Sequence, residues 1–363
     1  MPREFRLSML RLPLQHLFVS FALLAQLAVA QTTVETILTE FARPEDFSDL
    51  AGTPYLLVTE FGEFREEVGT LALLDTTDNT KVMPTITVSS DQLSLFADPT
   101  CTPRLPLANI APQGTAAWNN GDGTWDVAVV NHNAYESIEF FVLTIGTDGS
   151  PPTLATAGCT RSLGEGDAHN DVAFSSDGSR LFVTLWMNNY TGVMGLLGVL
   201  WSFLKPLPGG QGALKEIDVG GTASVITSGL NGANGLLFLN DSRIVVAENS
   251  ATKITAVNPV DGSTETLLEA RMVDNIMQDS PSSFLFTRID APFTFRVLPC
   301  NILGMFCTLP FTIVRYDWEA EQQTDVYSSS LDGLATVAMS KNNALYVGNV
   351  LTDRVMAITT LLE

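Results

Sequence analysis

One pattern recurs six times along this chain: a short apolar strand, a turn rich in aspartate, asparagine, serine and glycine, and a second apolar strand. The copies cover residues 45–62, 113–133, 171–186, 235–249, 273–289 and 336–350. Short strands with closely spaced turns are typical of all-β folds, and a repeated pattern indicates one structural unit repeated in space. Six repeats within residues 31–363 leave roughly 55 residues for each, enough for a four-stranded propeller blade with its loops. No linker-like change in composition divides the chain, so residues 31–363 are predicted to form a single six-bladed β-propeller.

Residues 1–30 differ from the rest of the chain in composition. Three arginines come first, a mostly apolar stretch follows over residues 17–27, and the AVA motif at 28–30 fits a cleavage site. This order is typical of a secretory signal peptide, and a retained anchor is the alternative. We therefore predict a signal peptide over residues 1–30 and a secreted or extracytoplasmic protein.

The chain is strongly acidic, with a formal net charge of −21 at pH 7. Without residues 1–30, which contain three arginines and one glutamate, the net charge becomes −23. Such a charge argues against nucleic acid or anionic lipid headgroups as partners, and it favours the binding of divalent cations.

Carboxylate and carboxamide side chains stand at the start of the first strand in several repeats. Because the innermost strands of a propeller begin near its central axis, these side chains would converge on one small volume. They are Glu45, Asn170, Asn234, Asp274 and Asn275. Their oxygen atoms are ligands of the kind that Ca²⁺ prefers, so the sequence predicts a central calcium-binding tunnel. Asp46 and Asp171 each follow one of these residues and would point the other way, where they could hold a second ion.

A simpler interpretation exists for each of these pairs taken alone. Asn-Asp and Asp-Asn are common turn dipeptides, because both side chains hydrogen-bond to nearby backbone. The recurrence of such pairs before strands in separate repeats is what favours a cation site.

At these residues the chain resembles the paraoxonase/arylesterase family of calcium-dependent lactonases. The resemblance extends over most of residues 31–363, and the order and spacing of its motifs make it specific. The motifs are PED (44–46), VVNH (129–132), SIEFF (137–141), HNDVAF (169–174), ANG (233–235), VAEN (246–249), VDNI (273–276) and TVAMSKNNALYVGNV (336–350). The related strictosidine synthase and gluconolactonase propellers share only parts of this series.

The resemblance implies two calcium ions. One, catalytic, would be held by the five residues of the predicted tunnel, Glu45, Asn170, Asn234, Asp274 and Asn275. The other, structural, would be held by Asp46, Asp171 and the backbone carbonyl of Thr115. The implied activity is hydrolysis of a small apolar ester or lactone, in which the metal stabilises the oxyanion as water attacks.

The chain departs from the family's pattern at the general base. The family uses two histidines, and the resemblance places one of them at His132 within VVNH. The other is replaced by Gln113, and glutamine can orient a water molecule but cannot accept a proton near neutral pH. We assign proton transfer to His132 and positioning to Gln113. His169 is an alternative base, although as the strand neighbour of Asn170 it should face away from the tunnel.

Residues 192–204 are apolar and uncharged, but they are too few to span a bilayer. In the family, an apolar helix at this place covers the mouth of the active site and helps attach the protein to lipid. We predict a helical lid with possible lipid contact here; a wall of an apolar substrate pocket and a buried helix between blades are the alternatives.

Four cysteines lie in the chain, at positions 101, 159, 300 and 307. An even number in an exported chain favours disulfides. Cys300 and Cys307 are close enough in sequence to clip one loop, which would leave Cys101 with Cys159. Three pairings are open, and the sequence does not choose among them.

Signatures of other enzyme classes are missing: the sequence has no GxSxG, HExxH, Walker-type or GxGxxG motif. The prediction is therefore a calcium-dependent esterase or lactonase. The alternatives are a non-catalytic, calcium-stabilised propeller that acts as a binding module, and chemistry of the gluconolactonase or strictosidine synthase type.

Overall fold

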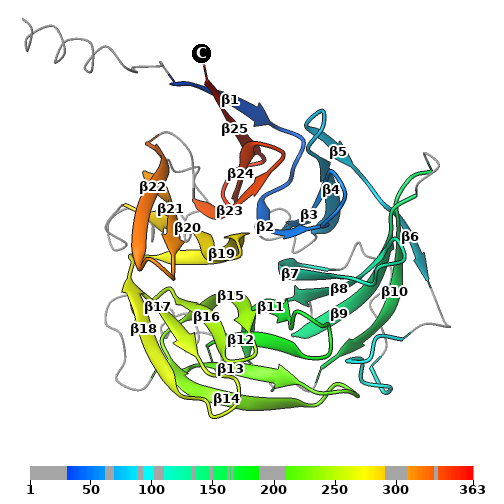
Figure 1. The fold of residues 1–363 in the computed structure, drawn as a ribbon. Coiled ribbons are helices and arrows are strands. Elements are labelled where there is room, and N and C mark those ends of the chain that lie inside the picture. Colours follow the sequence, from blue (N-terminus) through cyan, green and yellow to red (C-terminus); the bar gives the residue numbers. More distant parts are fainter. Residues whose placement is uncertain are drawn as a thin grey trace, which may run out of the picture.

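Six β-sheets surround a central axis in the computed structural model, so the predicted six-bladed propeller is confirmed (Figure 1). The structure describes residues 31–61, 69–88, 93–101, 110–132, 136–146, 150–161, 164, 167–187, 210–290, 309–330 and 334–362. Every regular element among these residues is a strand. In the described part of the chain, no helix is long and apolar enough to cross a membrane.

The first three blades take up the N-terminal half of the propeller, and in each the four consecutive strands run from the innermost outwards. Blade 1 contains β2 (Pro44–Asp49), β3 (Tyr55–Glu60), β4 (Thr70–Asp75) and β5 (Thr80–Val82). Blade 2 contains β7 (Pro112–Asn119), β8 (Thr124–Asn131), β9 (Ser137–Thr144), β10 (Thr153–Thr160) and, parallel to β10, β6 (Thr85–Val88). Blade 3 contains β11 (Ala168–Phe174), β12 (Leu181–Met187), β13 (Gly212–Ile217) and β14 (Ala223–Leu230).

The remaining blades complete the ring. Blade 4 contains β15 (Ala233–Asn240), β16 (Arg243–Glu248), β17 (Lys253–Val257) and β18 (Thr264–Glu269). Blade 5 contains β19 (Val273–Ser280), β20 (Ser283–Ile289), β21 (Phe311–Asp317) and β22 (Gln322–Ser329). Blade 6 contains β23 (Ala335–Lys341), β24 (Ala344–Asn349), β25 (Val355–Leu362) and β1 (Gln31–Leu38). The six sequence repeats are thus the two inner strands of each blade.

Blade 6 is built from both ends of the described chain. Its outermost strand, β1, pairs antiparallel with β25 from Gln31 opposite Leu362 to Leu38 opposite Val355. Figure 1 shows these strands, blue and red, side by side at the top of the ring. The pairing closes the propeller, because it ties the start of blade 1 to the last blade.

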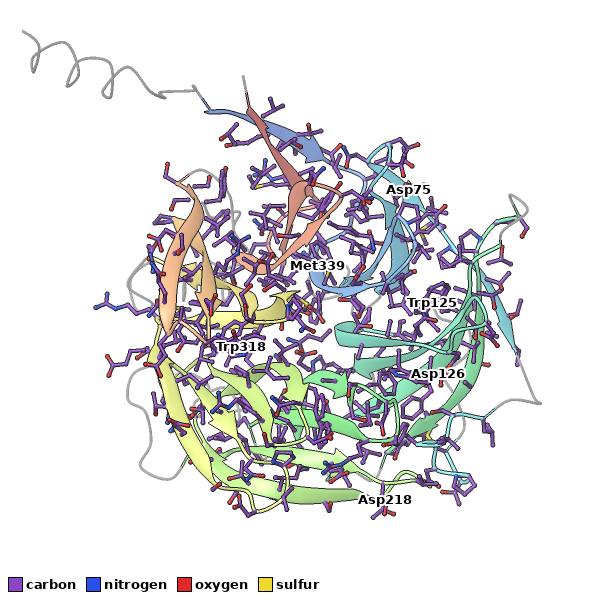
Figure 2. The ribbon with its side chains drawn as sticks, in the orientation of Figure 1. Asp75, Trp125, Asp126, Asp218, Trp318 and Met339 are labelled. Carbon is purple, nitrogen blue, oxygen red and sulfur yellow. A yellow bond between two sulfur atoms is a disulfide. The ribbon has the colours of Figure 1, made fainter. Side chains whose placement is uncertain are left out.

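Apolar side chains fill the space between each pair of neighbouring blades. Six clusters of buried residues occur, one at every junction, including the junction of blade 6 with blade 1 around Phe47 and Tyr346. Figure 2 shows Trp125 and Met339 inside this layer and Asp218 at the outer edge. Because the central strands are covered on both faces, their sequences are mostly apolar, as in β12, where Thr184 alone is polar.

The turns between strands explain the polar residues of the repeats. Asn342 and Asn343 both adopt positive φ, 50° and 62°, in the two-residue turn between β23 and β24. Asparagine tolerates this conformation better than most residues, and such a turn matches the twist of a hairpin.

A disulfide joins Cys101 to Cys159 of β10, with 58 residues of sequence separation. This is one of the pairings left open by the sequence. Cys300 and Cys307 lie outside the described residues, as do the predicted signal peptide and the predicted lid over residues 192–204.

Loss of this disulfide is expected to destabilise blade 2. Closing a loop of 58 residues restricts the unfolded chain by about 4 kcal/mol in the chain-entropy model. The double variant Cys101→Ser, Cys159→Ser should melt roughly 6 °C lower in a thermal scan. A double variant at Cys300 and Cys307 serves as the comparison, and an unchanged melting temperature for the first variant would contradict the expectation.

Candidate functional site

The innermost strand of every blade begins with a break in its register. In blades 2 to 5, two residues of the innermost strand lie opposite one residue of the neighbouring strand. In blades 1 and 6, one residue of the innermost strand has no partner in the pairing. The residues within these bulges are Glu45, Gln113, Gly114, Asn170, Asp171, Asn234, Gly235, Asp274, Asn275 and Thr336. A β-bulge frees a residue from the ladder and re-aims its side chain, and bulges are common beside active sites. The five predicted ligands of the catalytic ion, together with Gln113 and Asp171, therefore lie at one structural position in five blades.

Two glycines allow the inner strands to approach closely. A Cβ atom on Gly114 would lie 2.4 Å from the carbonyl oxygen of Asn170 and 2.5 Å from Asp171. One on Gly235 would lie 2.5 Å from the carbonyl oxygen of Asp274 and 2.6 Å from Asn275. Both contacts are too short for any side chain, so only glycine permits them. This explains why glycine follows Gln113 and Asn234 in the sequence.

We call Glu45, Asn170, Asn234, Asp274 and Asn275 the axial site. Its members come from blades 1, 3, 4 and 5. Asn275 is fully buried and donates from Nδ2 to the backbone carbonyl of Glu45 at 3.2 Å and to its Oε1 at 3.3 Å. Glu45, Asn170 and Asn234 are also buried, and Asp274 is mostly buried, with a smaller part of its surface exposed. Contacts across the axis thus link residues 230 positions apart in sequence.

Four oxygen atoms of the axial site are buried without a hydrogen-bond partner. They are Glu45 Oε2 and the Oδ1 atoms of Asn170, Asn234 and Asn275. A buried oxygen without a partner costs free energy, and most buried polar groups in native proteins are satisfied. Carboxylate and amide oxygens of this kind are the donors that a hard cation takes. The donor set therefore fits a calcium ion, although no group of three or more His, Cys, Asp or Glu residues within the described ranges forms a metal-binding cluster.

The buried acids of this region disfavour each other's charge. Burial, followed by the charges of Asp46 and Asp274, holds the pKa of Glu45 well above its usual value. Burial also raises the pKa of Asp274 to about 7, against a lowering by a hydrogen bond from Asn234. A cation at the axial site would remove this penalty, because it favours the ionised carboxylates.

Asp46 and Asp171 have a second role that the sequence did not indicate. Asp46 Oδ2 accepts a hydrogen bond of 2.8 Å from the backbone amide of Thr115 in the next blade. Asp171 Oδ2 accepts one of 2.6 Å from the amide of Leu236, also in the next blade, and its Oδ1 one of 2.7 Å from Val172. We call Asp46 and Asp171 the interblade carboxylates, since each fastens its blade to the following one.

Asp46, Asp171 and the carbonyl of Thr115 suit the predicted structural calcium ion less well than the axial site suits the catalytic one. Only Asp46 Oδ1 is buried without a partner, and the Thr115 carbonyl already accepts from the Ser48 hydroxyl at 3.0 Å. Burial and the charge of Asp171 raise the pKa of Asp46, and burial raises that of Asp171. The second calcium ion stays a prediction.

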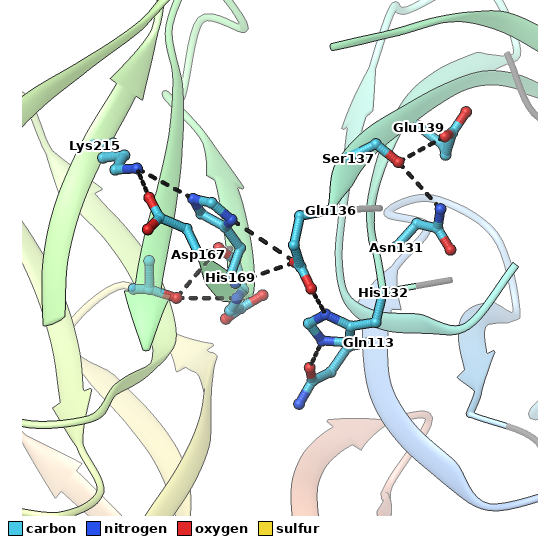
Figure 3. Close-up of polar contacts among 11 residues, drawn as sticks. Gln113, Asn131, His132, Glu136, Ser137, Glu139, Asp167, His169 and Lys215 are labelled. Atoms are coloured by element: carbon cyan, nitrogen blue, oxygen red, sulfur yellow. Dashed lines mark hydrogen bonds and ion pairs between the residues drawn. The ribbon is translucent and has the colours of Figure 1, made fainter. Parts of the chain in front are cut away.

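A chain of polar contacts runs from Gln113 towards blade 3 (Figure 3). Gln113 Oε1 contacts His132 Nε2, and His132 Nδ1 lies 2.7 Å from Glu136 Oε1. Gln113 is also close enough to Glu45 to lower the pKa of that carboxyl, so the chain reaches the axial site. The two predicted catalytic residues are thus in contact with each other and with a predicted cation ligand.

The same chain continues from Glu136 to His169. Glu136 Oε2 accepts from the backbone amide of His169 at 3.3 Å and lies 3.8 Å from its Nδ1. His169 Nε2 is 3.4 Å from Lys215 Nζ, which pairs with Asp167 at 2.9 Å. We call these six residues the histidine network: Gln113, His132, Glu136, His169, Lys215 and Asp167. Sequence reasoning missed Glu136, Lys215 and Asp167; the His-x-x-x-Glu spacing of 132 and 136 was the only local signal for any of them.

Several solved structures have a fold similar to that of this protein. No protein-family model matches the chain, and no curated protein matches it by sequence. The structure is similar to that of a luciferin-regenerating enzyme, with a TM-score of 0.54 and 11% identity, covering 91% of this chain and 96% of that one. It is also similar to a putative gluconolactonase, with a TM-score of 0.52 and 13% identity, covering 94% of this chain and 96% of that one. A gluconolactonase from Xanthomonas campestris has a TM-score of 0.50 and 13% identity, covering 94% of this chain and 93% of that one. At such low identity the similarity shows the fold alone.

Proposed function

We propose that the protein is a calcium-dependent hydrolase of lactones and carboxylic esters. The observation that carries the proposal is the group of four unpartnered buried oxygens at the axial site, linked through Gln113 to His132. The gluconolactonases of similar fold support lactone chemistry, and the resemblance of the sequence motifs to paraoxonases supports calcium and ester substrates.

A calcium ion bound at the axial site would polarise the substrate carbonyl and stabilise the oxyanion that forms on it. The residues of the axial site would hold that ion. His132 would accept a proton at Nε2 from the attacking water and return it to the oxygen of the leaving alcohol, so that the ring opens to a hydroxy acid. Gln113, which contacts Nε2, would position the water or the substrate.

Partners and location follow from the sequence. We propose a small apolar ester or lactone as substrate, export by the N-terminal segment, and contact with lipid through residues 192–204. A strongly acidic surface supports an exported protein that does not bind nucleic acid.

Hydrolysis assays test the proposal directly. The purified protein should hydrolyse aliphatic lactones or phenyl acetate in the presence of calcium, and chelation with EGTA should abolish turnover. Sugar-acid lactones belong in the same panel, since turnover of these alone would favour gluconolactonase-type chemistry. Turnover that persists after removal of all divalent cations would contradict a metal-dependent reaction.

A second candidate is a calcium-stabilised binding module without catalytic activity. Gln113 favours it, because this side chain engages the nitrogen of His132 that a water molecule would need. An absence of turnover across the panel, in a protein whose melting temperature falls on chelation, would select this candidate.

A further inference from the structure

Glu136 occupies an unusual position between two histidines of different blades (Figure 3). It directly precedes β9 of blade 2, and each of its carboxylate oxygens faces a different histidine. Oε1 is 2.7 Å from Nδ1 of His132, whereas Oε2 accepts from the backbone amide of His169 at 3.3 Å. The side chain is 18% exposed, so solvent covers little of it.

The carboxylate of Glu136 is ionised at every pH of interest. Burial would raise its pKa, but the hydrogen bonds with His132 and His169 and the charges of both rings lower it to about 2. An ionised carboxylate can only accept hydrogen bonds. The nitrogen of His132 that faces it must therefore carry a hydrogen atom, which fixes Nδ1 as the protonated nitrogen of the neutral ring.

With Nδ1 fixed, Nε2 is the nitrogen of His132 that can exchange a proton. It faces Gln113, whose carboxamide offers both a donor and an acceptor. In the structure the oxygen Oε1 of Gln113 faces Nε2, which suits that nitrogen after it has gained a proton. For the neutral ring the carboxamide must turn, so that its NH2 group donates to Nε2.

The far side of Glu136 is anchored by the neighbouring blade. His169 is 1% exposed, and its Nε2 lies 3.4 Å from the ammonium group of Lys215. An ammonium group only donates, so Nε2 accepts and the ring hydrogen of His169 sits on Nδ1, on the side of Glu136 Oε2. Both rings thus turn an N–H towards Glu136, and Asp167 balances the charge of Lys215 at 2.9 Å.

We propose that Glu136 is a positioning residue that fixes the tautomer and orientation of His132, with His169, Lys215 and Asp167 holding Glu136 in place. In the hydrolysis proposed above, on which this inference rests, Glu136 also stabilises the imidazolium that forms when His132 takes the proton of water. A carboxylate behind a catalytic histidine serves this purpose in the Ser-His-Asp triad.

Kinetics of Glu136 variants test the role in turnover. Glu136→Gln keeps the shape of the side chain but removes the charge, and it should lower kcat about 100-fold or more with KM and calcium affinity nearly unchanged. Glu136→Asp should recover part of the loss. Glu139→Gln is the matched control, because Glu139 lies in the adjacent strand and accepts from Ser137 at 2.8 Å. Wild-type kcat in Glu136→Gln, or an equal loss in Glu139→Gln, would overturn the proposal.

Histidine-selective ¹⁵N NMR tests the tautomers without any substrate. The sequence contains only three histidines, so at most six ring-nitrogen signals are expected. In the wild-type protein, the neutral rings of His132 and His169 should carry hydrogen on Nδ1, and Glu136→Gln should change the His132 signals. A wild-type His132 protonated on Nε2 alone would overturn the proposal even if lactones are hydrolysed. Conversely, a protein with the expected tautomers and no turnover would reject only the hydrolytic function.

Discussion

Without divalent cations, the protein will lose stability as the pH rises from 5 to 8, and calcium will remove most of that loss. The expectation follows from the buried acids around the axis. Burial raises the pKa of Asp274 to about 7 from its usual 3.8, and it raises the pKa of Glu45 as well. A carboxyl with a raised pKa in the folded protein stabilises that state at low pH, where both states bind the proton. The stability is lost as the pH rises towards the folded pKa, by about 1.4 kcal/mol per pH unit for each group.

The chosen pH window separates Glu45 and Asp274, together with the interblade carboxylates, whose pKa values are also raised, from the carboxylates on the surface. Surface aspartates such as Asp177, whose hydrogen bonds with Ser175 and Ser179 lower its pKa to about 2, finish titrating well below pH 5. Histidine is the side chain that ordinarily titrates between pH 5 and 8, and the chain has three. Burial lowers the pKa of His169, so that ring is already neutral over much of the window.

The measurement is the melting temperature at pH 5, 6, 7 and 8 after passage over a chelating resin, with and without 1 mM calcium. Calcium should raise the melting temperature most at pH 8, because the ion binds the ionised carboxylates and not the protonated ones. Asp274→Asn is the matched variant: it keeps an oxygen but removes the titrating group, so its metal-free stability should depend less on pH. A metal-free protein that is equally stable across the window and indifferent to calcium would reject the cation site.

The fold was predictable because the repeat pattern reports local structure. Alternation of apolar runs with Asp/Asn/Gly turns marks hairpins, and the six hairpins found in the sequence are the inner strand pairs of six blades. The closure of blade 6 by β1 was not predictable in this way. It joins strands from the two ends of the propeller, and the local sequence of Gln31–Leu38 does not indicate which strand it pairs with.

The candidate site was predictable only where the signal repeated. Asn170, Asn234 and Asn275 stand at the same position of successive repeats, so symmetry brings them to one axis. The histidine network lacks such symmetry, because Glu136 and Lys215 meet His169 from different blades. The interblade carboxylates show a further limit: the structure gives Asp46 and Asp171 backbone amides as partners, and a motif cannot distinguish an amide from an ion.

Replacing Asn275 with alanine should weaken calcium binding at the axial site and abolish hydrolysis. Asn275 is fully buried, its Oδ1 has no partner, and its Nδ2 holds both the backbone and the carboxylate of Glu45. Alanine would remove one oxygen from the site and take away one of the donors to Glu45, which disfavours the ionised form that binds a cation. Loss of a supporting residue alone commonly costs 10–100-fold in metal affinity, so removal of a ligand should cost about 100-fold or more.

Asn275→Asp separates the two contributions of this side chain. Aspartate keeps an oxygen at the site but cannot donate to Glu45. It also adds a negative charge beside carboxyl groups whose pKa values are already raised. It should therefore bind calcium at pH 8 yet be less stable than the wild type once the ion is removed. Isothermal titration of calcium into the metal-stripped protein measures the affinity, and lactone turnover measures the activity.

A control must show that loss of function in Asn275→Ala is not general unfolding. Asn258 lies outside the axis, between β17 and β18, where its Oδ1 accepts from the amide of Val260 at 2.9 Å. Asn258→Ala should cost a turn hydrogen bond of about 1 kcal/mol and leave calcium binding and turnover unchanged. Since the axial site is defined by buried oxygens without a hydrogen-bond partner in the protein, full activity and normal calcium affinity in a folded Asn275→Ala would show that the ion is held elsewhere.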